Sequence, residues 1–162
     1  MKDLPQGAKD FKEMADKYKQ LERNIPKIAG VIAVKTIREN FEVQGFIEEG
    51  KTASEKWESR KPETDYAYDN YKSYKGRNYK SSNPILKQTG NLKDAIAYKV
   101  EDEHKVFIGV NLSLVPYAKA HNEGLGNLPK RKFLDWSKAM SEAIHKDIIK
   151  RRKAIFKYFN KK

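Results

Sequence analysis

Two runs of alternating residues lie within the stretch LKDAIAYKVEDEHKVFIGV, residues Leu92–Val110. Apolar residues alternate with polar or small ones through 92–100, apart from Asp94. In the second run Val106, Ile108 and Val110 alternate with Lys105, Phe107 and Gly109. A period of two residues is typical of a strand with one buried face. Glu101-Asp102-Glu103 lies between the runs and predicts a turn. The stretch therefore predicts an antiparallel hairpin within a β region that spans residues 84–124.

Helical patterns precede this hairpin, in residues 10–40. The first has apolar residues at intervals of three, four and three, at Phe11, Met14, Tyr18 and Leu21. Pro26 interrupts the pattern and Asn24 is a suitable N-cap, so we expect two helices that meet near Asn24. The middle of the second, Ile28–Val34, is apolar all round and is expected to be buried. A short buried strand has a similar pattern, but the length and the alanines favour a helix.

Three shorter predictions follow the hairpin. Residues 112–115 predict a short edge segment stopped by Pro116, and 117–123 predict a helix ended by Gly124. Residues 135–159 predict a long helix, with Asp135 or Ser137 as its N-cap. Its apolar stripe is Trp136, Met140, Ile144, Ile148, Ile155 and Phe159. The chain is thus expected to be one α+β domain over 1–162, with N-terminal helices, a small antiparallel β-sheet and a long basic C-terminal helix.

Residues 51–83 have a different composition from the rest. Apart from five tyrosines, the segment contains one large apolar residue, Trp57. So few apolar side chains cannot offset the cost of ordering the backbone, and we expect a mobile loop. The tyrosines alternate with lysines and an arginine, so they could stack on bases as in single-strand binders, or pack on a neighbouring subunit.

The overall composition and charge exclude several classes of protein. The chain has 162 residues, no cysteine and a mean hydropathy of −0.88. It therefore has no disulfide, thiolate zinc site or cysteine nucleophile. No signal peptide or membrane span is expected, so we predict a soluble protein with no membrane partner.

The positive charge is concentrated at the C-terminus. The net charge is +12, and residues 130–162 contain twelve basic and three acidic residues. The C-terminal helix is therefore expected to face nucleic acid, anionic headgroups or an acidic protein, with a merely solvated basic helix as the alternative. Lys150, Arg151, Arg152 and Lys153 are the candidate contacts, and reversing their charge tests this hypothesis.

The sequence offers little catalytic chemistry. His121 and Glu123 lie two residues apart, which places them on different sides of a helix, so they are not expected to bind a metal together. There is no Gly-rich phosphate loop and no nucleophile elbow. Paired carboxylates such as Glu48-Glu49 lie in a polar context. We expect no catalytic residue, no metal and no cofactor, and regard a small nuclease or lysis enzyme as the least favoured alternative.

Six short segments occur in an order that resembles a known family. They are NFEVQGF (40–46), Trp57, ILKQTGNL (85–92), VFIG (106–109), YAKAHNEG (117–124) and LPKRKFL (128–134). The order is similar to that of the phage virion morphogenesis family, the tail-completion or head–tail joining proteins of Mu-like and other contractile-tailed phages. The motif positions are Phe41, Gly45, Trp57, Gly90, Leu92, Tyr117, Ala118, His121, Gly124 and Arg131.

The resemblance implies a structural role at these positions. It implies a protein that assembles into a ring at the end of the tail tube and contacts the tail tube and the head–tail connector, with incidental contact to phage DNA. Its location would be the neck of the virion, and the host cytoplasm during assembly. The alternative is a nucleic-acid-binding module whose C-terminal helix contacts phosphates.

Overall fold

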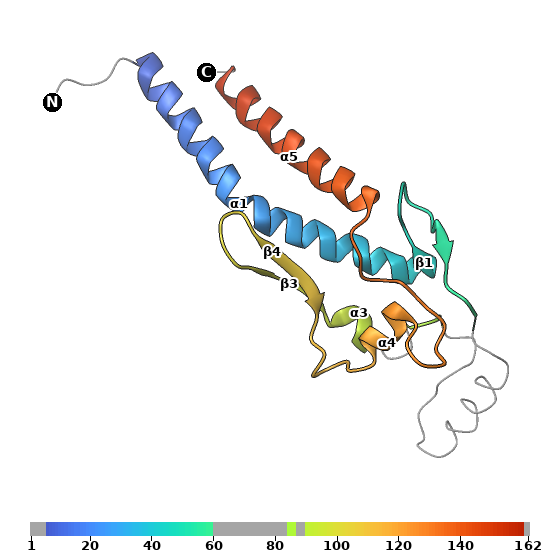
Figure 1. Cartoon of the computed structure of the whole chain (residues 1–162). Helices are drawn as coiled ribbons and strands as arrows, with labels where there is room; N and C mark the ends of the chain where they lie inside the picture. Colours follow the sequence, from blue (N-terminus) through green and yellow to red (C-terminus); the bar gives the residue numbers. More distant parts are fainter. Residues whose placement is uncertain (1–5, 60–83, 87–89, 161–162) are drawn as a thin grey trace.

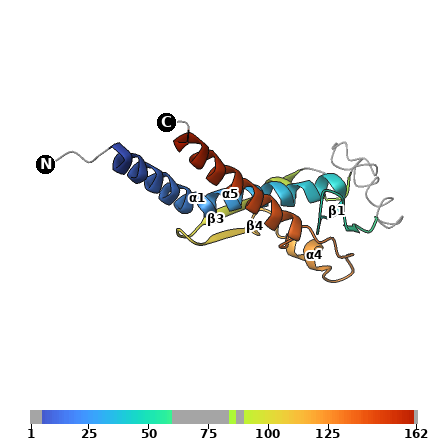
Figure 2. The same cartoon turned by 90° about the horizontal axis from the view of Figure 1, so that it is seen from above.

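The computed structural model describes residues 6–59, 84–86 and 90–160. Two long helices dominate it, α1 (Gln6–Val43) and α5 (Lys138–Phe159), and they pack against each other (Figure 1). Seen from above, α5 runs obliquely across α1 (Figure 2). The α+β class expected from the sequence is confirmed.

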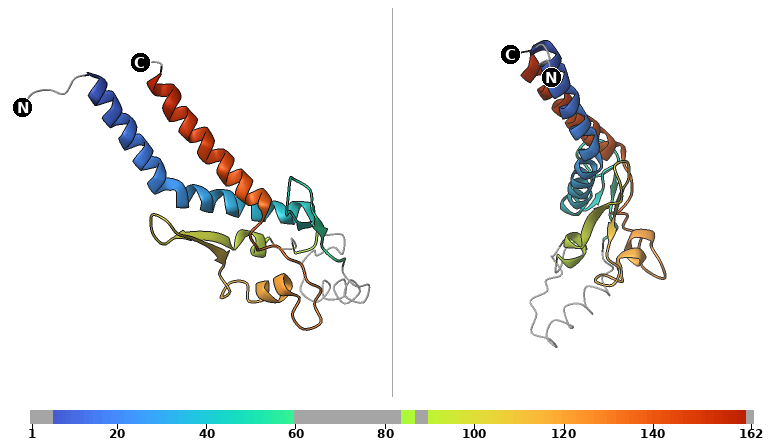
Figure 3. Two further views of the ribbon diagram at one scale, coloured as in Figure 1. Left: turned by 45° about the horizontal axis from the view of Figure 1, so that its top comes forward. Right: turned by 90° about the vertical axis from the view of Figure 1, so that its left-hand side faces the viewer.

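The sheets are small and antiparallel. Strand β3 (Ile96–Val100) pairs with β4 (Val106–Val110), with Tyr98 opposite Ile108, as the alternating residues predict. This hairpin packs against α1, and Figure 3 shows it on the side of the molecule away from α5. A second pair, β1 (Gly45–Phe46) with β2 (Glu55–Lys56), was not anticipated. The described residues also contain two short helices, α3 (Asn91–Asp94) and α4 (Ala118–Glu123).

The prediction of two N-terminal helices that meet near Asn24 is wrong, because α1 is one helix that contains Pro26. The helix changes direction in this region (Figures 1 and 3), as expected where a proline lacks the N–H and crowds the preceding turn. Asn24 is not an N-cap, since its Nδ2 donates to the carbonyl of Gln20 at 2.7 Å. Pro26 is buried, and packing against α5 and the hairpin keeps the helix continuous across the bend.

The apolar run Ile28–Val34 is helical as predicted, but it is not buried all round. Gly30 and Ala33 are buried, whereas Val31 is 50% exposed. Gly30 permits the close approach of the hairpin, because a Cβ built there would lie 2.3 Å from Cδ2 of Tyr98. The hairpin and α5 each cover part of α1, and Val31 lies between these two parts, where it lines the grooves that α1 forms with α5 and with the hairpin.

Two further boundaries differ from the sequence prediction. Leu92 belongs to α3, so β3 starts at Ile96. Residues 112–115 form a turn rather than an edge strand, because the N–H groups of Leu114 and Val115 both donate to the carbonyl of Asn111. Val115 is buried in the core while Leu114 is exposed, which accounts for the apolar pattern without a strand.

Part of the predicted mobile loop 51–83 can be compared with the structure. Residues 60–83 lie outside the described residues. Residues 51–59 contain β2 and the buried Trp57, so this part of the loop prediction is wrong. Pairing with β1 supplies the backbone hydrogen bonds, and burial of one large indole supplies the apolar contact that the composition suggested was missing.

The C-terminal predictions hold with one adjustment. Helix α4 ends at Gly124, whose φ of 71° is the left-handed conformation expected there. Helix α5 begins at Lys138, and the Ser137 side chain accepts a hydrogen bond from the N–H of Met140 at 3.2 Å. Ser137 is therefore the N-cap, and Asp135 is not. Trp136 precedes the helix and is exposed, so it is not part of the buried stripe.

The core gathers residues from every part of the chain that the structure describes. Helix α1 contributes one stripe, Ala33, Ile37 and Phe41, at intervals of four residues. The other buried members are Trp57, Leu92, Ile96, Val115, Ala118, Phe133, Met140 and Ile144. Within the described residues, no helix combines the length and apolarity needed to cross a membrane.

Candidate functional site

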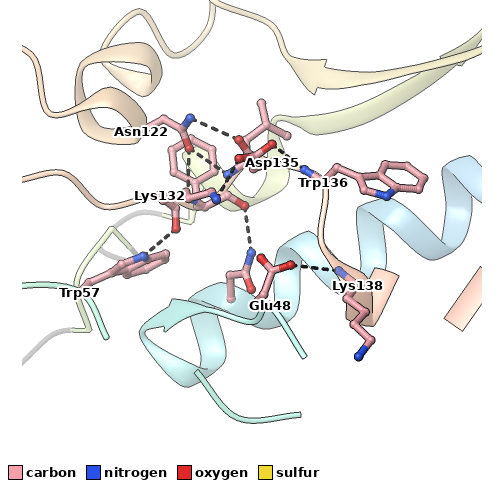
Figure 4. Close-up of polar contacts among 10 residues, drawn as sticks. Glu48, Trp57, Asn122, Lys132, Asp135, Trp136 and Lys138 are labelled. Carbon is pink, nitrogen blue, oxygen red and sulfur yellow. Dashed lines mark hydrogen bonds and ion pairs between the residues drawn. The ribbon is translucent and has the colours of Figure 1, made fainter. Parts of the chain in front are cut away.

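A short extended segment, residues 131–134, lies at the centre of the packed region (Figure 4). Phe133 is fully buried and its ring centroid lies 5.4 Å from that of Phe41. An extended segment outside a sheet needs other partners for its backbone groups. Three elements supply them, namely α1, the chain after β2, and α4.

Helix α1 and the β2 region bind one side of this segment. Nδ2 of Asn40 donates to the Phe133 carbonyl at 3.0 Å, and its Oδ1 accepts from the N–H of Ile47 at 3.0 Å. Nε1 of Trp57 donates to the Lys132 carbonyl at 2.8 Å. Asn40 is 2% exposed, so its amide satisfies two buried backbone groups that would otherwise lack partners.

Helix α4 binds the other side. Oδ1 of Asn122 accepts from the N–H groups of Phe133 and Leu134, both at 2.9 Å, and its Nδ2 donates to the Leu134 carbonyl at 3.2 Å. The N–H of Arg131 donates to the His121 carbonyl at 2.8 Å. The buried Arg131 side chain donates from Nε to the Glu58 carbonyl at 3.1 Å, within the subunit.

His121 lies in α4 and is half-buried. Burial lowers the pKa of His121, and the positive charge of Arg131 lowers it further. Nδ1 is buried and has no hydrogen-bond partner within the described residues, and the ring meets that of Tyr117 edge-on at 6.0 Å. Both effects favour the neutral imidazole. In the described part of the chain, His121 is not part of any cluster of His, Asp or Glu suited to a metal ion.

Segment 131–134 leads directly into α5, and a second set of contacts fixes the start of that helix. The Glu48 carbonyl accepts from the N–H of Ala139 at 2.8 Å, and the Glu48 carboxylate accepts from the N–H of Lys138 at 3.3 Å. A carboxylate at this position satisfies an otherwise unpaired N–H and suits the positive end of the helix dipole. The Lys138 side chain donates a hydrogen bond to Glu49, and this contact raises the pKa of Lys138. The direction in which α5 projects is thus set by the chain that follows β1.

An ion pair restrains the residues just before α5. Nζ of Lys132 lies 2.9 Å from Oδ2 of Asp135 and 4.1 Å from the centroid of the Phe46 ring. Hydrogen bonds from the Lys132 side chain and from the Trp136 N–H lower the pKa of Asp135. Asp135 therefore stabilises the turn that precedes α5.

The structure brings most of the family-motif positions together. Phe41, Trp57, Leu92 and Ala118 are in the core, and the Phe41 and Trp57 rings meet edge-on at 5.3 Å. The other motif residues support this core from its edges: Gly45 against the Glu55 carbonyl, Gly90 just before α3, Tyr117 and His121 at α4, Gly124 against Lys130, and Arg131 beside Glu58. These contacts are structural in kind.

The four predicted contact residues of α5 do not share one face. All four, Lys150, Arg151, Arg152 and Lys153, are exposed, but successive residues of a helix point in different directions. Arg151 turns toward α1 and donates to Asp147 at 2.5 Å. Of the four, Arg151 lines a groove of about 810 Å³ between α1 and α5, whose apolar lining includes Leu21 and Ile155.

Sequence reasoning missed three side-chain amides, of which Asn40 is buried and Asn122 and Gln44 are half-buried. Asn40 and Asn122 hold segment 131–134, and Gln44 binds both backbone groups of Ile85 through its own side-chain amide. The available signal was the position of Asn40, which lies three and seven residues after Ile37 and Ala33 on the buried stripe of α1. A polar residue on a buried stripe indicates a required hydrogen bond.

Comparison with known proteins finds no family model, no curated protein and no solved structure that matches the chain.

Proposed function

We propose that the chain is a structural assembly protein of the phage virion morphogenesis type. In this proposal it completes or terminates the tail and acts at the head–tail junction by assembling into a ring, without a catalytic role. A ring arises when one surface of a subunit binds a different surface of the next and the rotation closes. The proposal rests on the order of the six sequence segments, and on one feature of the surface.

That feature is the pair of helical arms at one end of the molecule. The N-terminal part of α1 and the C-terminal part of α5 extend beyond the hairpin (Figure 1). Large apolar side chains are exposed on them, among them Phe11 at 70% and Phe156 at 56%, with Tyr158 also exposed. Large apolar side chains that project into solvent from such arms are available for contact with another protein. The arms therefore support a role in assembly.

The rest of the structure is consistent with this role. The motif residues build or border the core, and the contacts of Glu48 and Ser137 fix the start of α5, so together these residues orient the arms. Function would then be geometric: the subunit presents its helices to neighbouring subunits, to the tail tube and to the connector.

Deletion of the gene in the phage or prophage that carries it tests the proposal. We expect negative-stain images of the lysate to show full heads beside unattached tails, or tails of uncontrolled length. The first phenotype indicates joining and the second indicates termination. Normal infectious particles would refute the assembly function.

A second candidate is a nucleic-acid-binding module, and the exposed lysines of α5 are the observation that favours it. It predicts an affinity for duplex DNA that falls with salt at a log–log slope of about −0.9 per phosphate contact. Absence of DNA binding at low salt would dispose of this candidate.

A further inference from the structure

The side of α5 that faces away from α1 carries a regular row of lysines. Lys146, Lys150, Lys153 and Lys157 follow at intervals of four, three and four residues, and all four are exposed. With 3.6 residues per turn, this spacing keeps the four side chains along one face of the helix. The row exists only because the segment is helical, and it is not the run of four consecutive basic residues that the sequence suggests.

Two apolar side chains accompany this row. Ile149 is 36% exposed and Phe156 is 56% exposed, and they lie seven residues apart. Each stands three or four residues from a lysine of the row, which is the distance of neighbours on a helix surface. We call the six residues the outer face of α5: Lys146, Ile149, Lys150, Lys153, Phe156 and Lys157.

The opposite side of α5 is already used within the subunit. Met140 and Ile144 are buried in the core, and Asp147, Arg151 and Ile155 line the groove with α1. No other described element lies against the outer face along the distal part of α5 in Figures 1 and 3. Helix α5 has two acidic residues, Glu142, which lies four residues before Lys146, and Asp147, which is paired with Arg151. The positive charge of Lys150, Lys153 and Lys157 is therefore not balanced by an unpaired carboxylate of their own stretch of the helix.

The helix dipole does not account for the row. Basic residues stabilise the last turn of a helix by interacting with its negative end, and the effect fades within that turn. Lys157 is in the last turn of α5, whereas the other three lysines precede it by one turn or more. Ile149 and Phe156 are exposed, so packing within the subunit does not explain why apolar residues occur at these two positions.

We propose that the outer face of α5 docks an acidic amphipathic helix of a neighbouring protein. Carboxylates spaced by the same helical period would meet the lysine row, and an apolar stripe beside them would cover Ile149 and Phe156. Charge complementarity selects an acidic partner, and an apolar centre with a charged rim is the usual construction of a helix docking surface. Phosphates of a nucleic acid would satisfy the lysines but leave Ile149 without a partner.

This inference deepens the proposed function and rests on it only for placing the partner in the virion. The docking chemistry can be tested on the full chain alone. The probe is a labelled synthetic helical peptide with Glu at intervals of four, three and four residues and Leu on the adjoining face. The reference probe has Gln in place of each Glu, and binding is followed by fluorescence anisotropy.

Two matched double variants distinguish an effect of the outer face from an effect of the net charge of the protein. Lys150→Glu with Lys153→Glu reverses two charges on the outer face, and Lys12→Glu with Lys19→Glu makes the same change in net charge at exposed lysines of α1. We expect the first pair to weaken peptide binding by about tenfold or more, since two attractive contacts become repulsive. The second pair should change it by less than about twofold.

The apolar contribution has its own matched pair. Phe156→Ser should weaken binding by about fivefold, and Phe11→Ser, at an even more exposed phenylalanine of α1, should have no effect. Because both side chains are largely exposed, both variants are expected to fold, and circular dichroism checks this.

Three results would overturn the inference. One is equal binding of the Glu and Gln peptides. Another is a duplex DNA that binds more tightly than the peptide and is unaffected by Phe156→Ser. The third is self-association that Phe156→Ser abolishes in sedimentation, which would make the occupant a second copy. Peptide binding that persists while gene deletion leaves particles normal would refute the proposed function and support the docking surface.

Discussion

Replacing Asn40 by alanine removes two hydrogen bonds from the centre of the molecule. The amide donates to the Phe133 carbonyl and accepts from the Ile47 N–H, each at 3.0 Å, and the residue is 2% exposed. Alanine leaves both backbone groups buried without a partner, at a cost of about 1–3 kcal/mol each. The better helix propensity of alanine returns about 0.5 kcal/mol. The expected loss in the free energy of unfolding is about 3 kcal/mol.

Asn24→Ala is the matched control. Asn24 lies on the same helix and its amide also makes a hydrogen bond, to the Gln20 carbonyl at 2.7 Å, but the site is exposed. Water replaces that contact, so a change within about 0.5 kcal/mol is expected.

Urea unfolding followed by circular dichroism and by tryptophan fluorescence measures both variants. Since Trp57 is buried and Trp136 exposed, fluorescence reports mainly on the core. Asn40→Ala should lower the midpoint with an unchanged m-value, because the surface exposed on unfolding stays the same. A loss of less than about 1 kcal/mol would refute the argument that segment 131–134 depends on this amide.

Three further predictions follow from single contacts. Gly30→Ala should lower the free energy of unfolding by about 1–2 kcal/mol, because the added Cβ clashes with Tyr98. In a Tyr98→Ala background the same change should be neutral or stabilising. Denaturation of the wild type, the two single variants and the double variant checks this. Trp57→Phe keeps the aromatic contact but leaves a buried carbonyl unpaired, so thermal unfolding followed by circular dichroism should show a loss of about 1–2 kcal/mol. The pKa of folded His121 lies below its ordinary value of 6.5, so the unfolded chain takes up the proton first. The stability that neutral His121 contributes is therefore complete above about pH 6.5 and falls as the pH drops below it. His121→Gln should flatten this dependence of the free energy of unfolding on pH, measured by denaturation at several pH values. A dependence equal to that of the wild type would contradict the lowered pKa.

The sequence by itself determined the elements whose signal is local. Alternation placed the β3–β4 hairpin, and the left-handed preference of glycine placed the end of α4. The capping residues before the last apolar stripe limited the start of α5 to Asp135 or Ser137, and the structure has Ser137 as the N-cap. Each depends on contacts between residues close in the chain, and a local pattern records such contacts. The resemblance to a family likewise identified positions that prove to lie in or beside the core.

Tertiary structure decided the rest. Packing on both sides of the bend keeps α1 continuous through Pro26, although the local preference is to stop. The composition around Trp57 indicates a loop, but contacts of Trp57 with Phe41 and Lys132 order this stretch. Both partners are distant in sequence, so no local pattern predicts the contacts. The outer face of α5 shows the same dependence: the sequence supplies twelve basic residues after 129, but only the rotation of the helix against α1 selects which of them face outward. Long-range contacts fix such choices, and no local pattern contains them.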